Sequence, residues 1–380
     1  MGGFGNIKGL KDISTIGVAS ITGSGISAIF WIYLAALMGA ENYGELGFYI
    51  SIASVATSIS FIGGPAAITV LVAKKIKIES TIYFLSITAS IISGIILYIA
   101  FTNIGLSIYV LGAVVYNLSV SELLGRKRYR EYSIYFTLQK VLFVILALVL
   151  YYLIGPEGVL IGIGLSFMPF LIQIYSGFRN HRINFQLLKT KWKFVTNNFF
   201  IDLSVVLNNQ MDRLIIGPMF GFAILGNYYL AIQVLMVLTL IPEIVRKYTI
   251  PEDSSGVNTT KIKIITVGFS FILALIGVLV IPQVLPIFFS EYKESVELIP
   301  LISLTIIPAT ISGLYNSKFL AHEKSNYVVI ANLISTVVLI SGVFILGQFL
   351  GVIGLAYAFL LSNIVKAIFY FCLNKKVQEI

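Results

Sequence analysis

Twelve continuous apolar stretches run through the chain, and they limit its fold more than any other feature. A helix needs about 20 apolar residues to cross a hydrocarbon core of about 30 Å. The stretches lie at 14–39, 46–72, 81–101, 104–121, 133–153, 158–177, 194–216, 222–244, 262–284, 297–317, 327–346 and 351–373. Strands of a membrane barrel would instead alternate apolar and polar residues. The sequence therefore predicts an all-α integral membrane protein with about twelve transmembrane helices.

The composition supports lipid as the solvent and argues against covalent chemistry. Of the 380 residues, 58% are hydrophobic and 11% are charged, against about 25% charged in soluble proteins. The single cysteine, Cys372, excludes a disulfide framework within one chain, and His181 and His322 both lie in polar breaks. Neither a phosphate-loop motif nor HExxH occurs. We therefore predict a transporter rather than an enzyme, with no cofactor, no metal and no nucleic-acid partner.

The positions of the cations predict the orientation of the chain. With the N-terminus in the cytoplasm, 22 of the 26 Lys and Arg residues fall in inner breaks, and the other four are Lys140, Arg213, Lys293 and Lys366. Most outer breaks are very short or acidic. The positive-inside rule then places both termini in the cytoplasm. We expect a multi-pass protein in the plasma (inner) membrane of a prokaryote.

The chain predicts two similar halves. The longest break divides it into an N-terminal six-helix bundle (1–177), a basic cytoplasmic linker (178–193) and a C-terminal six-helix bundle (194–380). Gly44 follows the first helix as Gly226 follows the seventh, and GVL at 158–160 opens the sixth helix as GVI at 351–353 opens the twelfth. An even number of helices makes this a parallel repeat, related by a pseudo-two-fold axis along the membrane normal.

Polar groups at membrane depth are functional candidates because they are expensive to bury in lipid. The seventh helix carries a stripe formed by Asn198, Asp202, Asn209 and Arg213, spaced 4, 7 and 4 residues apart. We expect this stripe to line a cleft, where Asp202 would exchange a proton or bind a cation. In the alternative interpretation, the same groups only hydrogen-bond neighbouring helices.

Two lysines also fall within predicted helices. Lys140 lies about two turns from the inner end of the fifth helix, and Lys366 lies at a similar depth in the twelfth. Either ammonium would suit an anionic phosphate or pyrophosphate group. The alternative is that each side chain extends along its helix to the headgroups.

Several segments resemble a known family. The loop GAENYGELGFY (39–49), the segments DRLIIG (212–217) and LGNYYLA (225–231), and the closing GVIGLAYA (351–358) resemble the polysaccharide (O-antigen type) flippases. Those proteins belong to the multidrug/oligosaccharidyl-lipid/polysaccharide exporter (MOP) superfamily. The resemblance covers almost the whole chain.

This resemblance implies two six-helix bundles around a central cavity. The substrate would be a polyprenyl-(pyro)phosphate-linked oligosaccharide, such as an O-antigen or other surface polysaccharide repeat unit, moved from the inner to the outer leaflet by alternating access. The polar face of the seventh helix would hold sugar, and Lys140, Lys366 or Arg213 would meet the phosphate. An H⁺ or Na⁺ gradient or the membrane potential would drive the cycle, with Asp202 as the coupling residue. Membrane lipids and the polysaccharide polymerase and export machinery are the implied partners.

Two alternatives remain open. One is a multidrug or small-cation antiporter of the same superfamily, which would place acidic groups in the cavity. The other is a membrane-embedded polysaccharide polymerase or transferase, which would need a large charged extracytoplasmic loop. The outer breaks here are only a few residues long, apart from that at about 285–296.

Overall fold

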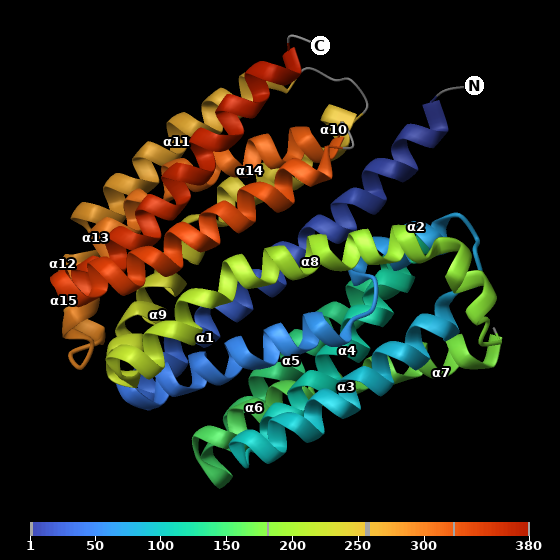
Figure 1. The fold of residues 1–380 in the computed structure, drawn as a ribbon, viewed down its shortest axis with the longest axis horizontal. Helices are drawn as coiled ribbons and strands as arrows, with labels where there is room; N and C mark the ends of the chain where they lie inside the picture. Colours follow the sequence, from blue (N-terminus) through green and yellow to red (C-terminus); the bar gives the residue numbers. More distant parts are fainter. Residues whose placement is uncertain (1–2, 181, 255–258, 322–323, 379–380) are drawn as a thin grey trace. The chain divides into compact units, whose positions relative to one another are not determined.

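The computed structural model describes residues 3–180, 182–254, 259–321 and 324–378, and these residues form helices joined by short breaks (Figure 1). In chain order the elements are α1 (Gly3–Ser60), α2 (Gly64–Ala73), α3 (Glu79–Phe101), α4 (Ile104–Gly125), α5 (Tyr129–Ile154), α6 (Pro156–Leu165), η1 (Met168–Phe170), α7 (Leu171–Asn180), α8 (Phe185–Phe220), α9 (Phe222–Leu238), α10 (Leu240–Ser254), α11 (Thr260–Leu279), α12 (Ile281–Phe288), α13 (Lys293–Leu304), α14 (Ile306–Ala321) and α15 (Ser325–Gln378).

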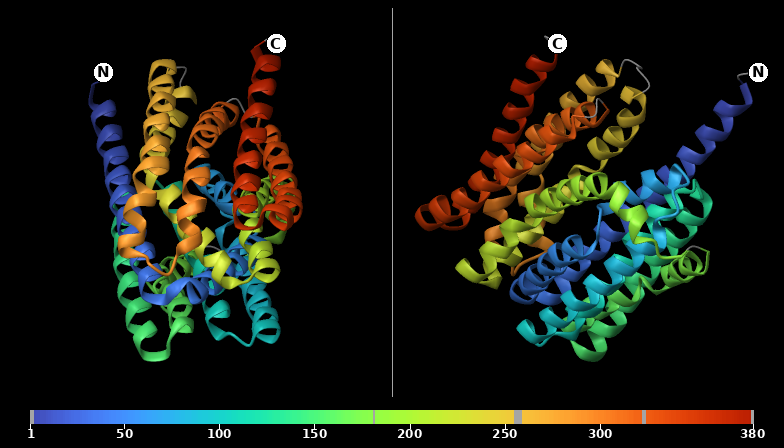
Figure 2. Two further views of the ribbon diagram at one scale, coloured as in Figure 1. Left: turned by 90° about the vertical axis from the view of Figure 1, so that its left-hand side faces the viewer. Right: turned by 45° about the vertical axis from the view of Figure 1, so that its right-hand side comes forward.

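Many of these helices are long and apolar enough to cross a membrane. Among the described residues seven segments qualify by length and composition, or up to nine if the bent pairs α9–α10 and α13–α14 each form one span. Two of the seven, Thr22–Ala73 and Ser325–Asn374, each hold two helices joined at a non-helical glycine, Gly39 or Gly351. The turn in α15 is clear in Figure 2. The predicted fold class, an all-α membrane protein of about twelve helices, is confirmed.

Contacts within the chain divide it into two units. Unit 1 comprises Met1–Phe30 and Ile52–Val206, and unit 2 comprises Trp31–Ser51 and Leu207–Ile380. Both α1 and α8 therefore contribute residues to both units. The domain boundaries expected from the sequence, 1–177 and 194–380, stay a prediction. The contact-based units differ from them in assigning Trp31–Ser51 to unit 2 and the first part of α8 to unit 1.

Unit 1 is built around α4, which packs against α2, α3 and α6. Large side chains such as Phe61, Tyr83 and Phe170 are buried in its core. The outer face of α3 is apolar as well, because Ile92 and Ile99 are 53% and 74% exposed. Exposed apolar side chains of this kind are expected on a helix face that meets lipid.

In unit 2, the second half of α1 approaches α9 very closely. A Cβ atom on Gly44 would lie 1.9 Å from the carbonyl oxygen of Phe222, and a Cβ on Gly226 would lie 1.8 Å from that of Ala40. Neither position has space for even a methyl group. Small residues allow such close approach between membrane helices. The two glycines that align in the sequence repeat thus lie at the same helix contact.

Tyr292, in the break between α12 and α13, is held in unit 2 by a buried hydrogen bond. Its hydroxyl is buried and donates a hydrogen bond to the carbonyl oxygen of Ala35 at 2.7 Å. Burial, and then the negative charge of Glu291, raises the pKa of Tyr292 above its usual value. The hydroxyl therefore remains a proton donor.

The predicted linker, 178–193, is helical at both ends. It contains the end of α7 and the beginning of α8. At the start of α8, the side-chain oxygen of Asn184 accepts a hydrogen bond from the backbone N–H of Leu187 at 2.9 Å, as an N-cap does. The backbone N–H of Asn184 donates to Thr81 Oγ1 at 2.8 Å. This region is therefore attached to unit 1 near the start of α3.

Candidate functional site

Asp202 lies in α8 beside the break between α1 and α2. Its Oδ2 accepts a hydrogen bond from Ser58 Oγ at 2.9 Å. The break contains Gly63 and Gly64, with φ of 91° and 66°. A Cβ on Gly64 would lie 3.0 Å from the Cβ of Asp202, so the carboxylate side chain is held against the first turn of α2.

A carboxylate in this position has two stabilising neighbours. One is the hydroxyl of Ser58, and the other is the partial positive charge at the N-terminus of α2. Asp202 is only half-buried, and within the described residues no Lys or Arg forms an ion pair with it. Such a group can hold a proton or a small cation. Asn198, one turn earlier in α8, donates through its side-chain amide to the carbonyl oxygen of Phe194 at 2.8 Å.

Lys140 lies in α5 of unit 1 among aromatic rings. Its Nζ is 5.4 Å from the ring centre of Phe136 and 5.8 Å from that of Phe143. A Cβ on Gly23 of α1 would lie 3.2 Å from its Cγ, so α1 passes close to the lysine stem. In the described part of the chain, no carboxylate forms an ion pair with Lys140. Among the described side chains the ammonium lies near two ring faces, and such contacts contribute about 0.5–2 kcal/mol.

Lys366 belongs to a separate polar cluster in unit 2. Its Nζ donates to Asn208 Oδ1 at 3.0 Å. The amide nitrogen of Asn208 then donates to Thr336 Oγ1 at 3.0 Å and to the carbonyl oxygen of Asn332 at 3.3 Å. These bonds join α8 to both halves of α15. Asn209, the residue that the predicted stripe includes, is exposed.

Arg213 is enclosed by its own unit and is only 5% exposed. Its guanidinium carbon lies 4.9 Å from the ring centre of Tyr229, and one of its terminal nitrogens donates to Gln210 Oε1 at 2.8 Å. The adjacent Asp212 accepts hydrogen bonds from the backbone N–H of Arg213 at 2.9 Å and from the Tyr228 hydroxyl at 2.8 Å. Arg213 thus packs under aromatic rings.

The predicted stripe on α8 is divided between the units. Asn198 and Asp202 belong to unit 1, and Asn209 and Arg213 belong to unit 2. The structure thus places Lys140 in the same unit as Asp202, and Lys366 in the same unit as Asn209. A role for any of these side chains at a substrate cavity stays a prediction.

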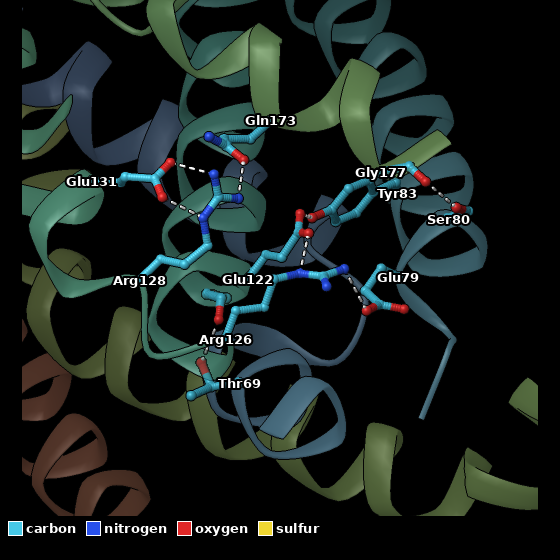
Figure 3. A network of polar contacts seen from close by, with 11 residues as sticks. Thr69, Glu79, Ser80, Tyr83, Glu122, Arg126, Arg128, Glu131, Gln173 and Gly177 are labelled. Carbon is cyan, nitrogen blue, oxygen red and sulfur yellow. Dashed lines mark hydrogen bonds and ion pairs between the residues drawn. The ribbon is translucent and has the colours of Figure 1, made fainter. Parts of the chain in front are cut away.

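Unit 1 also contains a network of charges that sequence reasoning did not predict (Figure 3). Arg126 pairs through Nε with Glu122 at 2.6 Å and through a terminal nitrogen with Glu79 at 3.1 Å. The buried hydroxyl of Tyr83 donates to the other oxygen of Glu122. The side chains of Glu79 and Glu122 are 5% and 4% exposed. The network joins the start of α3 to the end of α4.

Further bonds extend this network to α7. Ser80 Oγ donates to the carbonyl oxygen of Gly177 at 3.0 Å, and Arg128 donates to Gln173 Oε1 at 3.3 Å. Arg128 also pairs with Glu131 on α5. The sequence contained one signal, because Glu122 precedes Arg126 by the four residues typical of helical ion pairs. The sequence alone does not separate this ion pair from membrane anchoring, because the break after Glu122 holds four cations.

The comparison with known proteins depends on structure alone. No family model matches the chain, and no curated protein does. Among solved structures, the chain matches the inward-facing conformation of a multidrug resistance MATE family transporter of the MOP superfamily, with a TM-score of 0.71, 15% identity and 94% of each chain covered. It matches the lipid II flippase MurJ in an inward closed conformation with a TM-score of 0.72, 13% identity, and 95% and 87% covered.

The chain has the fold of MOP superfamily transporters. A third match is a MOP superfamily transporter from Pyrococcus furiosus, described as having a binding pocket of reversed polarity, with a TM-score of 0.57, 14% identity, and 96% and 95% covered. The fold that the sequence resemblance implied is thus confirmed. This fold accommodates transporters with different substrates, so the substrate must be argued from the side chains.

Proposed function

We propose that this protein is a flippase that moves a polyprenyl-(pyro)phosphate-linked oligosaccharide from the inner to the outer leaflet by alternating access. The proposal includes an O-antigen or another surface polysaccharide repeat unit as cargo. A fold shared with a lipid II flippase supports it. A transporter rather than an enzyme is supported by the same likeness.

The observation that carries the proposal is the state of the two intramembrane lysines. Within the described residues, neither Lys140 nor Lys366 forms an ion pair with a carboxylate. Lys140 contacts aromatic rings and Lys366 contacts the amide of Asn208. A positive charge in a membrane segment is costly unless an anion approaches it. A phosphate or pyrophosphate group would provide that anion, whereas a cationic drug would be repelled.

One observation favours a second candidate, a multidrug or small-cation antiporter. Asp202 accepts one hydrogen bond from Ser58 and has no ion pair in the described part of the chain. A cationic substrate could pair with it directly. In the flippase, the same carboxylate would instead carry the coupling ion, H⁺ or Na⁺. Each candidate uses Asp202, and only the flippase uses Lys140.

We place the protein in the plasma membrane of a prokaryote with both termini in the cytoplasm. The cations of the breaks support this orientation. A C-terminal fusion to a fluorescent protein should fluoresce, whereas a C-terminal alkaline phosphatase fusion should be inactive. An active phosphatase fusion would reverse the orientation. The polysaccharide polymerase and export machinery would receive the flipped product.

The experiment is complementation in a host that lacks its own polysaccharide flippase. Restored surface glycan, together with loss of lipid-linked oligosaccharide from the inner leaflet, is the expected result. A chain that reaches the membrane and leaves the pool trapped, even with its native glycan supplied, would contradict the proposal. Drug resistance conferred on the same host would then favour the antiporter.

A pair of lysine variants makes the assay specific. Lys140→Gln removes the intramembrane charge and should reduce flipping at least tenfold, because a charge-assisted bond contributes about 1.5–3 kcal/mol. Lys261→Gln removes an exposed cation at the start of α11 and should flip normally. Equal activity of the two variants would exclude Lys140 from substrate binding.

A further inference from the structure

The region around the start of α8 combines exposed cations with exposed aromatic rings. Phe185 and Trp192 are 54% and 52% exposed. Lys189 and Lys193 are also exposed. The spacings from 185 to 189 and on to 192 and 193 are those of one helix face. Together with the exposed Arg182, we name these five residues the linker face.

The adjacent side of the same helix segment is part of the unit 1 core. Leu188 and Val195 are 5% and 1% exposed and pack among the buried residues of that unit. The N–H of Asn184 is held by Thr81 Oγ1, and α7 is held through Ser80 and Gly177. Four of the five residues of the linker face are therefore carried by an anchored helix, α8 (Figure 1), and Arg182 lies in the short break before it.

The charge of this region is not balanced locally. Between Gly158 and Ile201 the sequence has five Lys and Arg residues and no Asp or Glu. Within the described residues, none of the cations of the linker face forms an ion pair. The network around Arg126 differs, because there each guanidinium has a carboxylate partner.

A membrane surface with anionic headgroups accounts for both the cations and the aromatic rings of the linker face. Tryptophan prefers the boundary between headgroups and acyl chains, and lysine stems lie along apolar surface while their ammonium groups reach the headgroups. Water alone would leave Phe185 and Trp192 exposed without compensation.

We propose that the linker face binds the headgroups of anionic phospholipids in the inner leaflet. Lys189, Lys193 and Arg182 attract the phosphate and carboxylate groups, and Phe185 and Trp192 enter the headgroup boundary. This inference is independent of the proposed function, because it requires no particular substrate.

The chain contains a natural probe of this contact, because Trp192 is one of only two tryptophans. In a Trp31→Phe background, Trp192 is the only one left. Trp31 makes an edge contact with the ring of Tyr229, and phenylalanine keeps an aromatic ring there. The protein is reconstituted into phosphatidylcholine vesicles that contain brominated phosphatidylglycerol or brominated phosphatidylcholine. Quenching of Trp192 fluorescence then gives the relative affinity of the two lipids for this face.

We expect phosphatidylglycerol to be preferred severalfold and the preference to weaken in high salt. Each cation near an anionic surface contributes about fivefold. Lys189→Gln/Lys193→Gln should therefore abolish the preference. Lys293→Gln removes one exposed cation at the start of α13 in unit 2 and should leave the preference unchanged.

Two results would overturn the inference. One is equal quenching of the Trp31→Phe protein by the two brominated lipids. The other is a Trp192 that brominated lipids do not quench and that aqueous iodide does quench, since this segment would then lie in water. Size-exclusion chromatography of every variant confirms that a changed signal comes from a folded protein.

Discussion

Alanine at position 44 would place a methyl group 1.9 Å from the carbonyl oxygen of Phe222. Ordinary contact begins at about 3.4 Å, so the second half of α1 and α9 would have to separate by about 1.5 Å. The obstructing atom belongs to the backbone and cannot rotate away. Overpacking a tight contact costs about 1–3 kcal/mol, and we expect the upper end of this range here.

The helix propensity of alanine opposes this steric cost, and it also determines the control variant. Alanine is a better helix former than glycine by up to about 1 kcal/mol. The net loss for Gly44→Ala is then about 2 kcal/mol. At Gly25, in the same helix α1, an added Cβ would meet nothing within 4 Å. Gly25→Ala should therefore keep or raise the stability.

The assay is thermal unfolding in detergent micelles, followed by size-exclusion chromatography of fluorescent fusions. Gly44→Ala should unfold at a clearly lower temperature than the unsubstituted protein, and Gly226→Ala should behave in the same way, because its Cβ would lie 1.8 Å from the Ala40 carbonyl oxygen. If Gly44→Ala unfolds at the same temperature as Gly25→Ala, the close contact between α1 and α9 is not present in the protein.

Three further predictions concern single side chains. Glu122→Gln removes one of the two carboxylates of Arg126, which keeps Glu79, and should cost about 1–3 kcal/mol of stability. Glu131→Gln, in a pair that is 38% and 41% exposed, should cost under about 1 kcal/mol. Equal thermal losses for the two variants would contradict this. Asp202→Asn keeps the hydrogen bond from Ser58 and should abolish ion-coupled transport without lowering the amount of protein in the membrane, so normal flipping would remove Asp202 from the coupling mechanism. Tyr292→Phe should lose about 1 kcal/mol at neutral pH, and because the raised pKa of Tyr292 gives stability that is lost as pH rises above about 10, this variant should lose less at high pH than the unsubstituted protein does.

The partners of the polar side chains were beyond what the sequence could predict. The hydroxyl that binds Asp202 comes from Ser58, 144 residues away in the chain. Lys366 meets its amide 158 residues away, at Asn208. Helical spacing places Asn209 on the predicted stripe, whereas the neighbouring Asn208 forms the hydrogen bonds to α15. Helical spacing predicts which residues share a face, but the packing of neighbouring helices determines which groups that face contacts.

The glycine breaks show a similar limit. Hydropathy placed a boundary between the first two spans and another between the last two. The structure joins the first span to the beginning of the second within α1, and the last two spans within α15, each across a single non-helical residue, Gly39 or Gly351. A bend at one residue needs no polar loop, so composition does not reveal it. The sequence also did not predict that α1 and α8 would each contribute to both units.

The sequence by itself determined that the chain is helical and lies in a membrane, because a backbone in lipid must satisfy its own hydrogen bonds and long apolar runs do so as helices. The pattern of Lys and Arg in the breaks supplied the predicted orientation, because translocation disfavours cations. The tertiary structure decided which buried charges are neutralised. Arg126 is paired with Glu79 and Glu122, whereas Lys140 meets only aromatic rings in the described part of the chain. That difference depends on distances of a few ångströms between helices, because electrostatic pairing is short-ranged. The spacing of residues along one helix does not set those distances.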